Sequence, residues 1–213
     1  MPQLHYYPGN ASMAPHLLLE EIGAPFDLKL VDRAQQAHKT AAYLRLNPNG
    51  LIPVLVDGDL VLYEAAAICL HLIDTHHQAG LAPAPGTPER AHFYKWLVWL
   101  TNSLQATLIL YFYPERWADT PEAVAQVRAH AEARVGTLLD QIEAELARHG
   151  GPWLLGETFS AVDLYALMVC RWTRGFARPA RSLPRLGPYL QRLLARPAVQ
   201  RVFDREALAQ PRV

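Results

Sequence analysis

The spacing of apolar residues divides the chain into a strand-rich first part and a helical second part. Residues 3–7 (QLHYY) and 26–31 (FDLKLV) are short β-prone runs, and a helical run from Ser12 to Ile22 separates them. Gly23 stands where a glycine ends such a helix. Two strands that are joined by one helix are expected to pair in parallel. The chain therefore opens with a predicted β-α-β unit.

A hairpin and a further helix complete the first part. The apolar β runs 53–56 and 60–62 flank Asp57-Gly58-Asp59, which is typical of a tight turn between antiparallel strands. A helix is predicted from Glu64 to His77, with its apolar positions on one face. The resulting order, β-α-β followed by β-β-α, is the thioredoxin-like order. We expect this domain to span residues 1–78.

The rest of the chain predicts helices only. Residues 79–87 form a Pro/Gly-rich linker, and residues 88–213 form an all-helical domain. Thr87-Pro88 and Thr120-Pro121 each offer a capping hydroxyl before a first-turn proline. Apolar steps of three and four residues predict one long helix up to Gly150. Ser160 and Asp163 have the spacing of a capping box that begins a buried helix.

Composition narrows the function classes. Lys plus Arg equals Asp plus Glu, at 20 each, so charge gives no reason to expect a nucleic-acid partner. No apolar run is long enough to span a membrane, and the N-terminus lacks the pattern of a secretory signal, so we expect a cytoplasmic protein. The cysteines Cys69 and Cys170 are interpreted as reduced and buried. The nine histidines lack metal-ligand spacing, so no metal site is expected.

Four segments, in order, carry a resemblance to a known family. LHYYPGNASMAPH (4–16) is similar to the YYSPGACSLAPH start of bacterial beta-class glutathione transferases. NPNGLIPVL (47–55) resembles the NPxGxxPxL segment of that family, and YEAAAICLHLI (63–73) resembles its ESxAIxxYL helix start. GETFSAVDL (156–164) resembles a G-x-x-x-[ST]-x-x-D motif of the second domain. The resemblance implies a cytosolic glutathione S-transferase that conjugates glutathione to small hydrophobic electrophiles.

The resemblance also implies how glutathione, as co-substrate, is bound. A cis bond before Pro53 would present the backbone of Ile52 to the cysteinyl part of glutathione, like an added strand. Glu64 would take the γ-glutamyl ammonium, and the N–H of Ala65 at a helix start would take the carboxylate. The family usually has Ser where Ala65 stands, so one hydrogen bond is absent. Lys39 lies in the segment that reaches the glycine carboxylate, although a solvated loop lysine is the alternative.

Three residues are candidates to stabilise the glutathione thiolate, which is the nucleophile. The beta-class cysteine falls on Ala11, which argues against mixed-disulfide chemistry. Ser12 is the first candidate, because a hydroxyl at a helix start lowers the pKa of a thiol nearby, and an N-cap serine without catalysis is its alternative. Asn10 follows, since an amide N–H does the same. Tyr6 is third, because LHYY resembles the LHYF of alpha-type enzymes.

The helical domain is expected to supply the electrophile pocket. The segment 102–117 places aromatic residues beside a few polar groups, and its candidates are Gln105, Tyr111, Tyr113 and Arg116. The family implies a homodimer that forms through the helix at 64–77 and the helix after Pro88. Two rival hypotheses remain. One is a non-catalytic glutathione-binding or regulatory protein of this fold, and the other is a maleylacetoacetate-type isomerase, whose Ser-Ser-x-x-x-x-Arg opening this chain lacks.

Overall fold

The computed structural model describes residues 1–213, and the chain forms two compact units. The first unit comprises Met1–Leu81 together with Leu194–Arg212, and the second comprises Ala82–Leu193 with Val213. No helix combines the length and the apolar character that crossing a membrane requires. The predicted fold class, an α/β thioredoxin-like part and a helical part, is confirmed.

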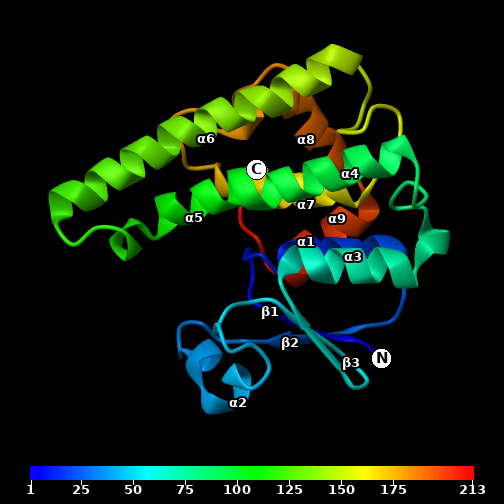
Figure 1. The fold of residues 1–213 in the computed structure, drawn as a ribbon, viewed down its shortest axis with the longest axis horizontal. Coiled ribbons are helices and arrows are strands. Elements are labelled where there is room, and N and C mark those ends of the chain that lie inside the picture. The colour runs from blue at the N-terminus through cyan, green and yellow to red at the C-terminus, as the bar shows by residue number, and fades with distance from the viewer. The chain divides into compact units, whose positions relative to one another are not determined.

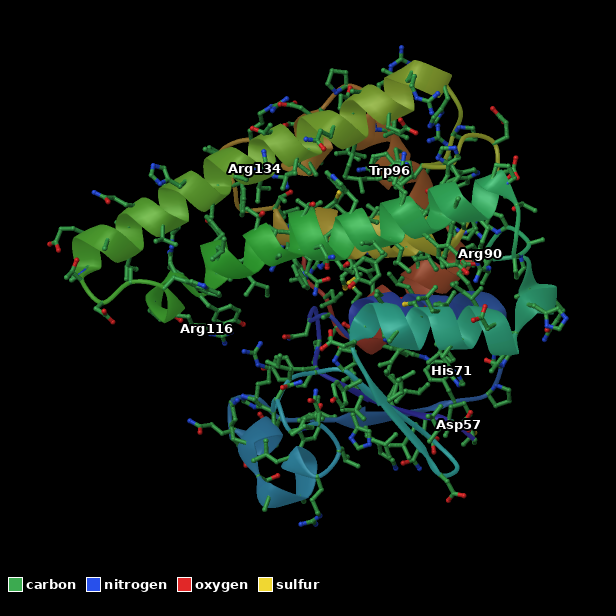
Figure 2. All side chains as sticks on the ribbon, viewed as in Figure 1. Asp57, His71, Arg90, Trp96, Arg116 and Arg134 are labelled. Atoms are coloured by element: carbon green, nitrogen blue, oxygen red, sulfur yellow. The ribbon has the colours of Figure 1, made fainter.

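A four-stranded mixed sheet forms the centre of the first unit (Figure 1). Its strand order is β2-β1-β3-β4, and the strands are β1 (Gln3–Tyr6), β2 (Asp27–Leu30), β3 (Val54–Asp57) and β4 (Leu60–Tyr63). β1 and β2 are parallel, as the β-α-β pattern predicts, whereas β3 is antiparallel to both β1 and β4. The Asp-Gly turn joins β3 to β4, and Asp57 lies on this hairpin in Figure 2.

Helices α1 (Met13–Ile22) and α3 (Ala65–Thr75) pack together on one side of the sheet (Figure 1). α1 buries Leu17, Leu18 and Leu19 completely, and it ends at Gly23, whose left-handed backbone donates an N–H to the carbonyl of Leu19. Short α2 (Ala41–Leu44) covers a smaller apolar cluster that contains Val31, Tyr43 and Val54. Because strand side chains alternate between faces, one sheet supplies both cores.

The second unit is built from helices only, and their order is α4 (Pro88–Trp99), a π-helical turn (Leu100–Gln105), α5 (Ala106–Phe112), α6 (Pro121–His149), α7 (Ala161–Trp172) and α8 (Leu186–Leu194). The hydroxyls of Thr87 and Thr120 cap α4 and α6 as predicted, and Gly150 ends α6 in a left-handed conformation. Every residue of α7 from Ala161 to Arg171 is buried, so α7 is the centre of this unit.

Asp163 joins the start of α7 to its surroundings. Its carboxylate accepts hydrogen bonds from the amides of Leu154 and Ser160, both at 2.8 Å. It also accepts from the hydroxyl of Tyr189 at 2.9 Å and from the Ser160 hydroxyl at 3.3 Å. The capping box that the sequence predicts is therefore present. Its carboxylate also binds the loop at Leu154 and helix α8 at Tyr189.

The C-terminal segment differs from the sequence-based division. Pro197 stands in the first turn of a further helix, α9 (Pro197–Arg205). Proline is tolerated there because its missing N–H would have no intrahelical partner. α9 packs on α1 in the first unit, although the sequence-based division assigned residues 88–213 to the helical domain. Its contacts are made by side chains remote in sequence, which periodicity does not report.

Substitution Asp163→Ala is expected to lower the free energy of unfolding by about 3–5 kcal/mol, because it leaves several buried donors without an acceptor. Urea unfolding measures this change. Asp140→Ala is the matched control, since Asp140 forms an exposed ion pair with Arg178 whose contribution is at most about 1 kcal/mol. Equal losses in both variants would contradict a structural role for the Asp163 network.

Candidate functional site

The register of the sheet brings several chain segments to one of its ends. β1 and β2 are parallel and leave the sheet at the same end, where His5 pairs with Val54 at the start of β3. Val54 also pairs with Tyr63, so β4 leaves the sheet there too. Four segments therefore meet at this end of the sheet: the first residues of α1, the loop after β2, the residues before β3 and the first residues of α3. Most of the predicted glutathione-binding and thiolate residues belong to these segments.

The buried side chain of Ser12 forms two hydrogen bonds within the connection between β1 and α1. Its side chain is fully buried, and its hydroxyl donates to the carbonyl of Tyr7 at 3.1 Å and accepts from the Tyr7 amide at 3.3 Å. In the same connection, the amide of Asn10 donates to the Tyr7 carbonyl, and Gly9 has a φ of 69°. The only hydroxyl proton of Ser12 is thus used within the protein.

Asn10 lies at the start of α1 with a fixed orientation. Its Oδ1 accepts a hydrogen bond from the guanidinium of Arg33 at 2.7 Å, and its Nδ2 donates to the carbonyl of Pro8 at 3.3 Å. Because a guanidinium only donates, the atom that faces Arg33 must be the amide oxygen. The second Nδ2 proton has no acceptor in the structure. The amides of Ala11 and Ser12, which follow, also donate to no acceptor.

Tyr6 is half-buried at the end of β1. Its ring makes an edge contact with the ring of His16, at a centroid distance of 6.1 Å. Burial raises the pKa of the Tyr6 hydroxyl, and the negative charge of Glu206 raises it further. Both effects keep this phenol protonated, so the Tyr6 hydroxyl retains a proton that it can donate in a hydrogen bond.

The residues before β3 present free backbone groups. The Ile52–Pro53 bond is cis, as the family resemblance implies. The carbonyl of Leu51 is occupied by the hydroxyl of Tyr43 at 2.8 Å and by the side-chain amide of Asn47 at 2.9 Å. The amide and the carbonyl of Ile52, in contrast, carry no hydrogen bond. An extended peptide placed alongside would satisfy both groups as an added strand does.

Glu64 and Ala65 form the start of α3. Glu64 is exposed and has a φ of 74° with a ψ of 114°, a conformation that is rare for any residue with a side chain. Backbone strain of this kind is often found at ligand-binding positions. Ala65 is the first helical residue, and its N–H has no acceptor. An acidic side chain therefore stands directly beside a helix start with free amides.

Lys39 is exposed, yet its side chain reaches the turn before Ile52. A Cβ atom on Gly50 would lie 2.9 Å from the Lys39 Nζ and 3.0 Å from the carbonyl oxygen of His38. Gly50 has a φ of 60°, so both space and conformation require glycine. The pKa of His38 is lowered by burial and by the positive charges of Lys39 and Arg33. This side of the site is thus cationic, which suits a carboxylate.

The predicted electrophile-pocket residues lie in the second unit. Tyr111 stacks on Phe176 with ring centroids 4.2 Å apart. The guanidinium of Arg116 lies 4.2 Å from the ring centroid of Tyr113, and Figure 2 shows Arg116 near the end of α5. Gln105 accepts a hydrogen bond from the hydroxyl of Tyr165 at 2.5 Å, so its amide oxygen links the π-helical turn to α7.

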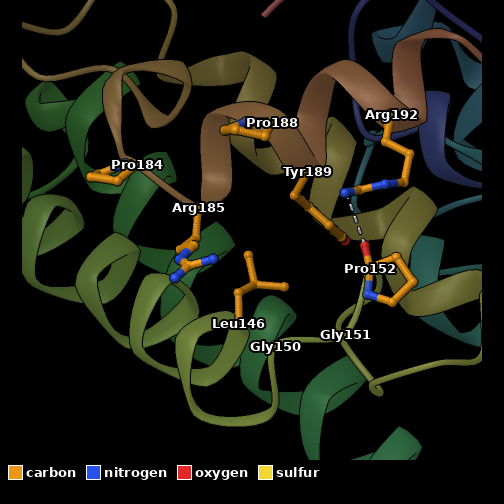
Figure 3. A pocket seen from close by; sticks show the side chains of 9 residues that line it. All are labelled: Leu146, Gly150, Gly151, Pro152, Pro184, Arg185, Pro188, Tyr189 and Arg192. Atoms are coloured by element: carbon orange, nitrogen blue, oxygen red, sulfur yellow. Dashed lines mark hydrogen bonds between the residues drawn. The ribbon is translucent and has the colours of Figure 1, made fainter.

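A separate pocket of about 130 Å³ lies elsewhere in the second unit, between the end of α6 and α8 (Figure 3). Arg185 and Arg192 line it, and Arg192 donates to the carbonyl of Pro152. It contains none of the predicted catalytic, glutathione-binding or electrophile-pocket residues. Nowhere do three or more His, Cys, Asp or Glu side chains gather as metal ligands would.

Sequence reasoning missed Arg33, which orients Asn10. Arg33 follows a strand and precedes a polar stretch, so nothing in its local pattern distinguishes it from a solvated loop residue. Its role depends on the parallel pairing of β1 and β2, which brings the loop after β2 beside the start of α1. Only a spatial argument from that pairing could have found it.

The fold and this site define a protein with a thioredoxin-like ligand-binding unit and a helical unit. Residues 11–75 match the family described as "Glutathione S-transferase, N-terminal domain", and residues 125–205 match "Glutathione S-transferase, C-terminal domain". Glutathione S-transferase GST-4.5 of Xanthomonas campestris pv. campestris is 30% identical over 97% of this chain and 99% of its own length. The chain belongs to the glutathione S-transferase family.

Solved structures agree with this assignment. A glutathione transferase homologue from Sulfitobacter, with bound glutathione, has a TM-score of 0.89 and 28% identity, and the match covers 98% of this chain and 99% of that one. The bacterial beta-class glutathione S-transferase of Sphingomonas chungbukensis has a TM-score of 0.83 and 31% identity, covering 97% of this chain and all of its own. The resemblance to beta-class enzymes is confirmed.

Substitution Ser12→Ala is expected to lower the free energy of unfolding by about 1–3 kcal/mol, because it removes the partner of two backbone groups of Tyr7. Chemical denaturation measures the loss. Ser182→Ala, which deletes an exposed hydroxyl, is the control and should change stability by no more than about 0.5 kcal/mol. If Ser12→Ala were as stable as the control, the buried hydroxyl would not hold this connection.

Proposed function

We propose that this chain is a glutathione transferase that conjugates the thiolate of glutathione to small hydrophobic electrophiles. The observation that carries the proposal is the free amide and carbonyl of Ile52, at the end of the sheet where the starts of α1 and α3 also lie. That arrangement fits a short extended peptide with charged ends. Relatives named as glutathione S-transferases, and a related structure that holds glutathione, support the same ligand.

Each part of glutathione then has a partner of suitable chemistry. Its cysteinyl backbone pairs with Ile52 beside Pro53, in the manner of strand addition. Its γ-glutamyl ammonium pairs with Glu64, and its γ-glutamyl carboxylate accepts from the N–H of Ala65 at the start of α3. Its glycine carboxylate is attracted by Lys39, whose ammonium lies over Gly50.

Asn10 is the residue that we propose as the thiolate donor. A thiolate at the start of α1 would accept the free Nδ2 proton of Asn10 and the free amides of Ala11 and Ser12. Arg33 orients this amide and adds positive charge near the sulfur. The hydroxyl of Ser12, which was the first candidate from the sequence, already donates its proton to Tyr7. Tyr6 keeps a free hydroxyl and is the remaining alternative.

The electrophile would bind against the aromatic residues of the second unit. Tyr111, Tyr113 and Arg116 offer aromatic rings and a cation, and Gln105 is the polar candidate, whose amide oxygen accepts from Tyr165. Such a lining favours flat, apolar electrophiles with electron-withdrawing substituents. We also propose a detoxification role in the cytoplasm, which fits this substrate class. A homodimer through the helix at 64–77 and the helix after Pro88 is also proposed, and the exposed side chains of Tyr94 and Val98 on α4 are consistent with burial in an assembly.

Substitution Asn10→Ala is expected to lower kcat with an aryl halide by about 10–100-fold, because a hydrogen bond to a charged group contributes ~1.5–3 kcal/mol. Steady-state turnover measures this effect, and calorimetry shows whether the variant still binds glutathione. Tyr6→Phe is the comparison, and it should retain most of the rate. If Tyr6→Phe lost the rate and Asn10→Ala kept it, the thiolate donor would be Tyr6. Absence of turnover in a glutathione-binding wild type, over a panel of electrophiles, would favour the non-catalytic alternative.

Substitution Glu64→Gln is expected to weaken glutathione binding by about tenfold, since it removes the charge that faces the γ-glutamyl ammonium. Isothermal calorimetry measures the dissociation constant. Glu157→Gln is the matched control, because Glu157 is an exposed glutamate in the second unit whose side chain forms no ion pair or hydrogen bond. Unchanged affinity in Glu64→Gln would remove Glu64 from the proposed binding site.

A further inference from the structure

An aromatic cluster lies where α5 ends in the second unit. The ring of Tyr111 contacts the rings of Phe112 and Phe176, with centroids 5.1 and 4.2 Å apart. Phe112 also makes an edge contact with Trp172 at 6.5 Å. Although Phe112 is a large apolar side chain, it is 41% exposed. The aromatic cluster of these four residues therefore presents a surface that a flat apolar group could cover.

Two arginines lie against tyrosine rings at this place. The guanidinium of Arg116 lies 4.2 Å from the ring centroid of Tyr113, and that of Arg128 on α6 lies 5.7 Å from the ring centroid of Tyr111. Both distances are within the range of cation–π contacts. Since Tyr111 and Tyr113 are only two residues apart in the sequence, both cations lie near the end of α5.

Neither guanidinium is neutralised by an acidic side chain. Arg116 and Arg128 form no ion pair and no side-chain hydrogen bond. Glu132 lies one turn after Arg128, but its carboxylate accepts a hydrogen bond from a backbone amide instead. In the same unit, Arg178 does pair with Asp140, at 2.6 Å. A guanidinium over a ring uses its face for that contact, so its in-plane N–H groups remain available to a ligand.

We propose that the electrophile is an aromatic compound that carries an acid group, such as a carboxylate or a sulfonate, and that Arg116 and Arg128 select it. This substrate class rests on the proposed function and narrows it. The ring of the electrophile packs on the aromatic cluster, and its acid group accepts in-plane hydrogen bonds from a guanidinium, whose fork matches two oxygens. A neutral electrophile of the same shape gains only the aromatic contact.

The acid group takes no part in the chemical step. The glutathione thiol first loses its proton to solvent, and the thiolate sulfur then forms a bond to the ring carbon that carries a halogen. The halide leaves with the electron pair of the broken carbon–halogen bond. Because the acid group only adds a binding contact, its effect is expected in kcat/KM.

The test compares a chloronitrobenzoate with the matching chloronitrobenzamide, which has the same ring and leaving group but no charge. Each kcat/KM is divided by the rate constant of the uncatalysed reaction with glutathione, because carboxylate and amide activate the ring differently. On this scale the wild type should favour the benzoate about three- to tenfold, between the effects of an exposed ion pair and of a bidentate one. Added salt should reduce the preference, since it screens exposed charges. Calorimetry with the two glutathione conjugates repeats the comparison without turnover.

Arg116→Gln and Arg128→Gln should each lower the preference for the benzoate, and the double variant should abolish it. Arg134→Gln is the matched control, because Arg134 is an exposed arginine of α6 without a ring contact or an ion pair, and Figure 2 shows it well apart from Arg116. This control changes the net charge equally and should keep the preference of the wild type. The two tested arginines are exposed, so both variants should fold, which circular dichroism checks.

Three results would overturn the proposal. If the wild type accelerates both reactions equally and binds both conjugates equally, the acid group is not recognised, and the proposed function stands. If Arg134→Gln lowers the preference as much as Arg116→Gln does, the general charge of the unit attracts the benzoate, and the two ring-bound arginines do not select it. If the wild type turns over neither compound and binds neither conjugate, the proposed function fails and the substrate class fails with it.

Discussion

The buried hydroxyl of Ser12 is bonded to both the amide and the carbonyl of Tyr7, and this pair of hydrogen bonds fixes how the chain passes from β1 into α1. Breaking either hydrogen bond would leave a buried polar group without a partner, which costs free energy. The two bonds therefore favour a single geometry for this connection. That geometry sets the direction of the first amides of α1 and of the Asn10 side chain. The rest of the site is arranged around it by the register of the sheet.

Two helix starts and one free strand edge then share the same end of the first unit. Each offers backbone groups that the fold itself leaves unsatisfied, at the starts of α1 and α3 and at Ile52. Side chains add charge of the appropriate sign, with Glu64 beside α3 and Lys39 beside Gly50. In the proposed function, recognition of a short peptide by this unit is thus mainly a property of the backbone, and the N–H of Ala65 contributes to it without a side-chain hydroxyl.

Local sequence patterns predict the helix ends and the hairpin well, because each of these features depends on residues that are only a few positions apart. Examples are the capping hydroxyls of Thr87 and Thr120, the helix-ending glycines at 23 and 150, and the Asp57-Gly58 turn. The candidate site is harder to predict from the sequence. Arg33 and Glu206 contact the start of α1 from other elements, and neither contact leaves a periodic signal. The sequence makes Ser12 the first candidate for the thiolate donor, because its local pattern does not show that the Tyr7 carbonyl accepts its hydroxyl proton.

In the proposed function, the start of α1 holds the glutathione sulfur, with Asn10 as the side-chain donor. A crystal structure of the chain with bound glutathione tests it most directly. We expect the sulfur to lie within hydrogen-bonding distance of the Asn10 Nδ2 and of an amide at the start of α1, with the Ser12 hydroxyl still bonded to Tyr7. A sulfur bonded to the hydroxyl of Tyr6 or of Ser12, or a tripeptide that leaves Ile52 unpaired, would contradict it.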